Sequence, residues 1–239
     1  MLSIVLKRTN FREADQLISL YTDERGKVEV LARGIKKITS KNSMALEPFA
    51  VVDVDLVPGK EIEHLTTAQV VESFSNIRGD LFRLTLGGIA LQLVDTHTQV
   101  GVAESGIFRL LHSYLTYLHS TPAVTLISMS MLALRLLSLL GFTPTFDVCP
   151  VCGREWGSAT LVFSLADGGA IHSHCVRPTN GVVYLATDSA VQTALRDMLT
   201  VPWDQEQKNE TALHDLVYQF ALYHSGRALP DWRAIARPL

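Results

Sequence analysis

Val52-Asp53-Val54-Asp55-Leu56 sets the class of the N-terminal part of this 239-residue chain. The strict alternation of apolar and acidic residues is typical of a β-strand with one buried and one solvent-facing side. The three apolar side chains then point to a core and the two aspartates to water. The turn-prone Pro58-Gly59-Lys60 follows, and it predicts a hairpin into a further strand from Ile62 to about Val71.

The residues upstream continue the same pattern. Apolar runs occur at Ile4–Leu6, Leu17–Tyr21 and Val28–Ala32, and Asp23–Gly26 supplies a turn between the last two. Five short strands with turn-rich connections predict a small antiparallel barrel over the first 75 or so residues.

The apolar period becomes helical after about Gly79. Gly87-Gly88 interrupts the first helical segment, which predicts a close helix crossing or a bend. Two later segments repeat apolar residues at the i, i+3, i+4, i+7 spacing of a helix with one buried face. Their residues are Ile107, Leu110, Leu111, Tyr114, Leu115 and Leu118, and then Leu213, Leu216, Val217, Phe220 and Ala221.

The stretch from Ala123 to Phe142 is apolar enough to suggest a membrane span. It contains Arg135 and is bracketed by Pro122 and Pro144. An arginine near the centre of a span costs about 2.5–3.5 kcal/mol on insertion scales. A buried core helix is therefore favoured over membrane association. The N-terminus also lacks the charge order of a signal peptide, so we expect a soluble, cytoplasmic protein.

The composition predicts a folded protein with a local basic region. Hydrophobic residues make up 47% and charged residues 19%, which excludes global disorder. The net charge of −3 argues against a nucleic-acid binder built on overall positive charge. Met1–Ala45 nevertheless holds nine Lys and Arg against five Asp and Glu, and the rest of the chain carries −7.

A turn-prone basic loop runs from Arg33 to Asn42 within this region. Such a loop beside a barrel suits contact with the phosphates of a single strand, although charged runs are often ordinary solvated loops. Phe11 and Tyr21 could stack on bases or belong to the core. The candidate DNA-binding residues are Arg8, Arg33, Lys36, Lys37 and Lys41.

The cysteines give the strongest chemical pattern. Cys149 and Cys152 are followed by His172 and Cys175, in the order C-x2-C-x19-H-x2-C, with a hairpin-like stretch between the pairs. Two residues between ligands let a tight turn aim both side chains at one ion, and thiolates with an imidazole suit tetrahedral zinc. Four protein ligands leave no open position for water, so the predicted zinc is structural. His174 is a competing ligand, but His172 repeats the x2 spacing. The alternative is that no metal is bound, and that the cysteines are simply buried beside a pair of surface histidines.

Arg135 lies on the apolar helix predicted around it, in a narrow polar stripe with Ser128 and Ser138. This stripe is either the wet side of the helix or an anion-binding position beside an apolar groove. In the second case, the helix from Thr125 to Leu140 forms one wall of the groove and Arg135 binds a partner's terminal carboxylate.

Taken together, these motifs resemble the RecO family of recombination mediators. The resemblance covers nearly the whole chain in order. It is carried by Ala32-Arg33-Gly34, Leu46–Phe49, Leu134–Pro144, Cys149–Gly153, Phe163-Ser164, Gly168-Gly169, His172-x2-Cys175 and Tyr223–Arg227. The chain departs from the family in two places: His172 stands where zinc-bearing members typically have a cysteine, and Ala228–Trp232 replaces a more basic stretch.

The resemblance implies an α+β fold with an N-terminal five-stranded OB-fold barrel, an α-helical body and an inserted zinc knuckle. We expect the barrel over residues 1–76, a helical domain over 77–145, the knuckle over 146–186, and C-terminal helices that pack on the helical domain over 187–239. The implied function is non-enzymatic. It comprises single-stranded-DNA binding, strand annealing and the loading of recombinase onto DNA coated by single-strand-binding protein. The implied partners are RecR and the C-terminal tail of that coating protein, which Arg135 would bind, at the bacterial nucleoid.

Two other classes of protein remain as alternatives. One is a zinc-stabilised adaptor that contacts only proteins. The other is a zinc-dependent deaminase or hydrolase, but deaminases pair H-x-E with P-C-x2-C, and here Val148 precedes Cys149 and no H-x-E occurs. No G-x-S-x-G nucleophile motif is present either.

Overall fold

The computed structural model describes residues 1–37, 42–157, 159–177 and 183–235. The described residues divide into two compact units, Met1–Val124 and those from Thr125 to Ile235. The change from strands to helices that the sequence places near residue 77 lies inside the first unit.

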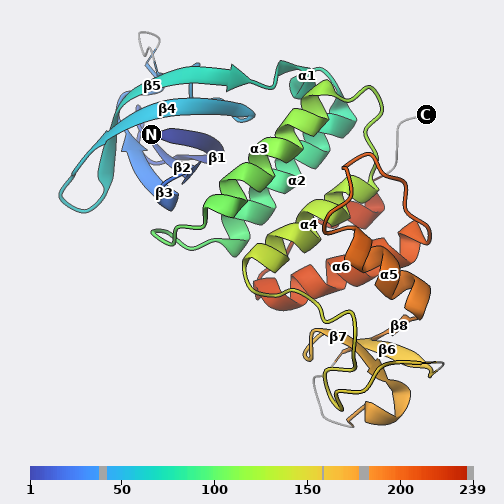
Figure 1. Cartoon of the computed structure of the whole chain (residues 1–239). Helices are drawn as coiled ribbons and strands as arrows, with labels where there is room; N and C mark the ends of the chain where they lie inside the picture. Colours follow the sequence, from blue (N-terminus) through green and yellow to red (C-terminus); the bar gives the residue numbers. More distant parts are fainter. Residues whose placement is uncertain (38–41, 158, 178–182, 236–239) are drawn as a thin grey trace. The chain divides into compact units, whose positions relative to one another are not determined.

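The first unit begins with the predicted five-stranded barrel, which is confirmed. The barrel is closed in the order β1-β2-β3-β5-β4, and all neighbours are antiparallel except β3 and β5 (Figure 1). Its strands are β1 (Leu2–Asn10), β2 (Gln16–Thr22), β3 (Gly26–Ala32), β4 (Ala50–Val57) and β5 (Glu63–Ser73). The alternation in β4 is also confirmed, because Val52 and Val54 are buried in the barrel core while Asp53 and Asp55 are exposed.

Three helices complete the first unit. α1 (Ser75–Arg78) is short, α2 (Leu81–His97) is capped by Asp80, whose carboxylate accepts from the Arg83 amide at 2.9 Å, and α3 (Ser105–Ser120) is the predicted amphipathic helix. Figure 1 shows α2 and α3 side by side along the barrel. Gly87, where the sequence predicts a close helix crossing or a bend, is closely packed against the residue before β4: a Cβ there would lie 2.7 Å from Cε1 of Phe49 and 3.3 Å from Cγ2 of Ile77 in α1.

A buried ion pair joins the barrel to α2. Lys27 of β3 is only 7% exposed, and its Nζ lies 2.7 Å from Oδ1 of Asp95 and donates to the Asp95 carbonyl. The Ser19 hydroxyl donates to the same carboxylate at 2.9 Å. Next to Lys27, Gly26 has a φ of +67°, and a Cβ there would lie 2.0 Å from the Val102 carbonyl oxygen. Because a buried charge is tolerated only when paired, this contact requires helix and barrel together.

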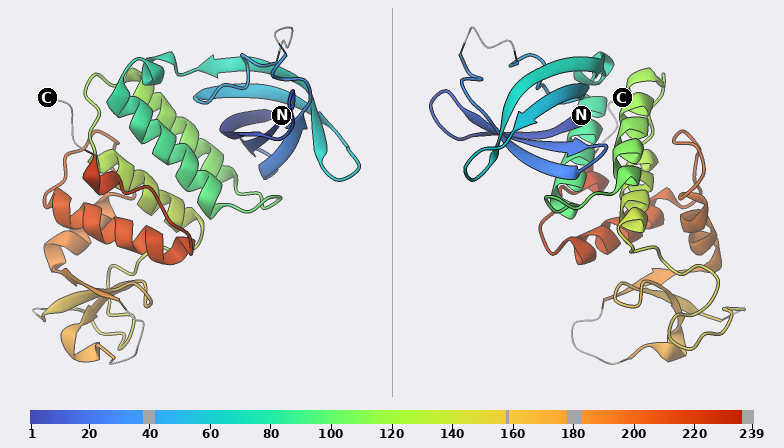
Figure 2. Two further views of the ribbon diagram at one scale, coloured as in Figure 1. Left: turned by 180° about the vertical axis from the view of Figure 1, so that it is seen from behind. Right: turned by 60° about the vertical axis from the view of Figure 1, so that its left-hand side comes forward.

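The second unit is built on α4 (Ile127–Leu139) and α6 (Glu210–Ser225), which lie side by side (Figure 2). α4 is the predicted buried core helix, since ten of its 13 residues are buried. Among the described residues, no helix is long and apolar enough to cross a membrane. α5 (Ser189–Asp197) and the short helix η2 (Trp232–Ala234) pack on α6, and the Trp232 side chain is fully buried.

A small three-stranded sheet belongs to the same unit. It has the order β7-β6-β8, with β6 (Leu161–Ser164), β7 (Gly169–His172) and β8 (Tyr184–Thr187), and the single turn η1 (Ser173–Cys175) follows β7. β6 and β7 form the hairpin predicted between the two cysteine pairs, and Gly168 turns it with a φ of +64°. The hairpin places the end of β7 opposite the Cys149–Cys152 turn.

Candidate functional site

Four metal-binding side chains come together at the end of this hairpin. The ligand atoms of Cys149, Cys152, His172 and Cys175 all lie within 4.8 Å of one another. The amide of Gly153, which has a φ of +70°, donates to the Cys149 carbonyl at 2.8 Å and closes the tight turn that aims both cysteines inward. A tetrahedral metal ion with metal–sulfur distances near 2.3 Å holds its ligand atoms roughly 3.8 Å apart. The four ligand atoms therefore need to move only slightly closer together to bind such an ion.

The orientation of His172 favours it over His174 within this group. His172 is 4% exposed, and its Nδ1 lies 3.4 Å from Cys152 Sγ while its Nε2 lies 3.2 Å from the Glu155 carbonyl. A metal-binding histidine commonly donates its other ring N–H to a carbonyl or carboxylate, which fixes the ring. His174 is exposed, and its ring stacks on His172 with the centroids 5.0 Å apart. The geometry therefore suits Nδ1 of His172 as the ligand atom.

The thiol environment also suits a cation. Burial raises the pKa of the Cys149 thiol, but hydrogen bonds from the backbone of His172, Cys152 and Val151 outweigh it and lower the pKa to about 6. Burial, together with the neighbouring Cys152 and Cys149 thiols, raises the pKa of Cys175 to about 11. A bound metal ion would stabilise the thiolates and displace the remaining protons. The group can hold a metal ion, and its three sulfurs fit a thiophilic one.

The predicted basic residues occupy different settings on the barrel. Arg33, Lys36 and Lys37 are exposed, and Nη2 of Arg33 lies 3.3 Å from Nε2 of His64. Arg8 is half-buried and is held by Glu47 and Gln16. Lys41 lies outside the described residues. Of the predicted set, Arg33, Lys36 and Lys37 are therefore free of carboxylate partners among the described residues and exposed to solvent.

The loop after β3 is tied to the turn between β1 and β2. The Gly34 amide donates to Oδ1 of Asp15 at 2.7 Å, the Lys36 amide donates to the Ala14 carbonyl at 3.1 Å, and Lys36 Nζ donates to the Arg12 carbonyl at 3.3 Å. This brings Arg12, which sequence reasoning did not single out, beside the predicted lysine loop. Arg12 is one of the nine Lys and Arg residues counted in Met1–Ala45, but that count does not show where in the fold Arg12 lies.

The two aromatic candidates separate clearly. Tyr21 is fully buried, its hydroxyl donates to the Glu104 carbonyl at 3.0 Å, and burial raises its pKa to about 12. Phe11 is 49% exposed. Tyr21 is thus a core residue, and Phe11 is available at the surface of the β1–β2 turn.

Arg135 does not lie on a fully solvated side of its helix. It is half-buried, and Ser128 of the same stripe is fully buried. Nε of Arg135 donates to the Met198 carbonyl at 2.8 Å, Nη2 donates to the Val201 carbonyl, and the guanidinium lies 4.1 Å from the centroid of the Trp203 ring. Burial lowers the Arg135 pKa to about 10. Among the described residues no carboxylate pairs with this cation.

Ser130 and His214 of the second unit lie as close together as a catalytic serine–histidine pair, but neither side chain is accessible to a substrate. The Ser130 Oγ lies 2.8 Å from Nδ1 of His214, and both residues are buried. Trp232 donates its indole N–H to the same oxygen at 3.0 Å. A substrate cannot reach this hydroxyl, so the contact fixes η2 to α4 and α6.

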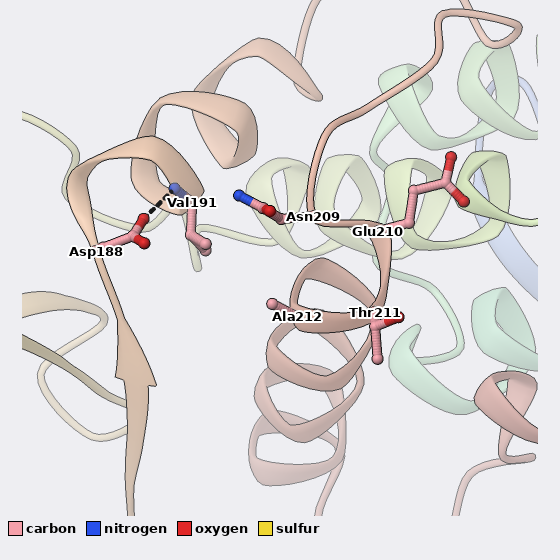
Figure 3. Close-up of a pocket in the computed structure, with 6 residues that line it drawn as sticks. All are labelled: Asp188, Val191, Asn209, Glu210, Thr211 and Ala212. Carbon is pink, nitrogen blue, oxygen red and sulfur yellow. Dashed lines mark hydrogen bonds between the residues drawn. The ribbon is translucent and has the colours of Figure 1, made fainter.

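A pocket of about 440 Å³ lies between the N-terminal ends of α5 and α6 (Figure 3). It contains none of the predicted site residues. Asp188 at its edge accepts from the Val191 amide at 2.8 Å, and Glu210 adds a second acidic side chain. The two carboxylates oppose the binding of phosphate groups at these helix ends.

Comparison with known proteins gives matches along most of the chain. The family model described as "Recombination protein O N terminal" matches residues 2–74, and the model described as "Recombination protein O C terminal" matches residues 78–233. Similar proteins include DNA repair protein RecO of Geobacter sulfurreducens, 34% identical over 73% of this chain and 72% of the relative. RecO of Desulforamulus reducens is 33% identical over 72% and 67%, and RecO of Anaeromyxobacter sp. (strain K) is 28% identical over 95% and 91%.

Proposed function

The chain belongs to the RecO family of DNA repair proteins, and we propose that it acts within this family as a non-enzymatic recombination mediator. It binds single-stranded DNA, promotes the annealing of strands and helps to load recombinase onto DNA coated by single-strand-binding protein. The observation that carries this proposal is the group of exposed cations at one loop cluster of a closed five-stranded barrel. Barrels of this kind bind single strands through a positively charged surface that follows the backbone.

Lys36, Lys37 and Lys41 make the main phosphate contacts in this proposal, together with Arg33 and Arg8. The described part of the loop supports this role, because Lys36 is hydrogen-bonded to the β1–β2 turn and Lys37 is exposed beside it. Arg8 already pairs with Glu47, so it contributes only when a phosphate displaces that carboxylate.

The test of the proposed function is direct binding by the full chain. A labelled single-stranded oligonucleotide is expected to bind with an affinity that falls linearly, on logarithmic axes, as salt rises. Annealing of complementary strands coated with single-strand-binding protein is expected to accelerate in the same salt range. Binding of partner proteins without any binding of the oligonucleotide would instead identify an adaptor that contacts only proteins.

One structural zinc ion is the second part of the proposal. Cys149, Cys152, His172 and Cys175 would hold it, and four protein ligands leave no position for a reactive water. When bound, the ion cross-links the Cys149–Cys152 turn to the end of β7. A zinc-dependent deaminase or hydrolase needs an open coordination position, and this ligand set fills all four.

The partners we propose are RecR and the C-terminal tail of single-strand-binding protein, in the bacterial cytoplasm at the nucleoid. Arg135 is the proposed contact for the terminal carboxylate of the tail. Its charge is held by neutral carbonyls and by Trp203, so a partner's carboxylate would supply the missing counter-ion. A planar guanidinium binds a carboxylate through two parallel hydrogen bonds, which an ammonium cannot do.

Replacing Arg135 with Ala is expected to weaken the binding of a labelled tail peptide by about tenfold or more, the range for a lost charge-assisted hydrogen bond. DNA affinity and zinc content stay unchanged. Because Arg135 also holds the end of α5, a loss of thermal stability accompanies the effect.

Arg196→Ala provides the matched control. Arg196 lies on α5, donates to the Phe146 carbonyl at 2.8 Å and pairs with Asp147, so its loss also removes a structural arginine. The control is expected to bind the peptide as the unaltered protein does. Equal peptide affinities for the unaltered protein and Arg135→Ala would place the tail site elsewhere.

A further inference from the structure

Phe11 is an exposed aromatic residue of the turn between β1 and β2 in the first unit. It follows the last residue of β1, and its amide and that of Arg12 donate to the Asp15 carbonyl at 3.2 and 3.4 Å, which closes the turn to β2. The side chain is 49% exposed although burying an aromatic ring is strongly favourable. An exposed apolar side chain by itself is common on protein surfaces. The surroundings of the ring therefore decide what Phe11 can bind.

One cation lies over the exposed ring, and a second is bound to the same turn. The guanidinium of Arg12 lies 5.1 Å from the ring centroid, and Lys36 Nζ donates to the Arg12 carbonyl at 3.3 Å. One carboxylate of the turn, Asp15, is occupied by the Gly34 amide, while Glu13 is exposed. The cations of Arg12 and Lys36 thus lie next to an aromatic surface, with the carboxylates of Glu13 and Asp15 in the same turn, and this turn is hydrogen-bonded to the loop after β3.

We propose that Phe11 is a stacking platform for a base of single-stranded nucleic acid, with Arg12 and Lys36 on the adjoining phosphates. This inference rests on the proposed single-strand binding and names the group that holds a base. Every base has a π-face, so one aromatic ring beside cations gives affinity without sequence preference. A partner protein's apolar side chain would gain nothing from the neighbouring cations, whereas a nucleotide uses both the ring and the charge.

The test compares a single-stranded oligonucleotide with an abasic strand of the same length and charge, using the full chain. The unaltered protein is expected to bind the base-containing strand about tenfold more tightly, within the range for one base–aromatic stack. Phe11→Ala and Phe11→Leu are both expected to lose this preference, because leucine keeps the apolar bulk but has no ring. Phe11→Trp is expected to keep or increase the preference.

The salt dependence separates stacking from charge contacts. Phe11→Leu is expected to keep the salt slope of the unaltered protein, since no phosphate contact is removed. Leu81→Ala is the matched control: Leu81 is 78% exposed at the start of α2, and its loss is expected to change neither strand's affinity. Thermal unfolding of each variant checks that the barrel is intact.

The outcomes of this test distinguish the two levels of the proposal. If the unaltered protein binds neither strand, the proposed single-strand binding is wrong. If it binds both strands but Phe11→Leu retains the full preference for bases, single-strand binding stands and the stacking role of Phe11 is wrong.

Discussion

Replacing Cys149 with Ser is expected to remove the metal ion and to unfold the segment from Cys149 to Thr187. The Cys149 side chain is fully buried. Burial raises the pKa of its thiol, but hydrogen bonds from the backbone lower it on balance, which favours the thiolate that a metal ion binds. A serine hydroxyl supplies no thiolate at neutral pH. Structural zinc contributes about 10–16 kcal/mol in small metal-dependent folds. A loss of that size exceeds what the small sheet can offset.

The sheet beside the metal site is small, since β6, β7 and β8 have four residues each. Away from the metal site it is anchored by Phe163 of β6, which is fully buried and packs edge-on against Phe220 of α6 with the ring centroids 5.6 Å apart. The zinc content of the purified variant, measured by metal analysis, is expected to fall from one ion per chain to near zero. Limited proteolysis is expected to cleave between Cys149 and Thr187, and a strong chelator is expected to produce the same cleavage in the unaltered protein.

His174→Ala is the matched control for this prediction. His174 is exposed and its ring only stacks on His172, so zinc content and protease resistance are expected to stay at the level of the unaltered protein. Retention of one zinc by Cys149→Ser, or loss of zinc in His174→Ala alone, would overturn the proposed ligand set.

The joint replacement of Lys36, Lys37 and Lys41 with Ala is expected to flatten the salt dependence of single-strand binding. Each phosphate contact on a single strand releases about 0.7 counterion, so the loss of three contacts lowers the logarithmic slope by about 2. At low salt the affinity falls similarly for all sequences, because phosphates carry no base information. Titrations at several salt concentrations measure both quantities.

Lys208→Ala serves as the control for the lysine variant. Lys208 is an exposed lysine of the second unit, and its loss changes the net charge without touching the barrel. Its slope is expected to match that of the unaltered protein. An unchanged slope in the triple variant would move the DNA-binding surface away from this loop.

Local sequence patterns were enough to predict the barrel and the grouping of the three cysteines with His172. Strand alternation such as that of Val52–Leu56 reports directly which side chains are buried, because the period of a strand is two. The C-x2-C and H-x2-C spacings similarly bring ligands together within single turns. Both features depend on residues that are close in the sequence.

Contacts between distant residues could not be predicted in this way. The guanidinium of Arg135 donates to carbonyl groups more than 60 residues downstream, which the local sequence does not indicate. Its surroundings therefore match neither a solvated helix face nor an unoccupied anion site. Tyr21 and Phe11 are both aromatic residues of the β1–β2 region, and only the packing of Tyr21 against the Glu104 carbonyl separates core from surface. The burial of Ser130 with His214 and Trp232 likewise needs three distant segments.

The ion pair between Lys27 and Asp95 has a consequence for how this protein can be cut into parts. The two family models meet between residues 74 and 78, yet a fragment ending there would keep Lys27 in the barrel and lose its carboxylate. Such a fragment loses the Lys27–Asp95 ion pair together with the packing of α2 on the barrel. A chimera that transplants the barrel onto another protein therefore needs α2 and α3 as well, with the junction after Val124.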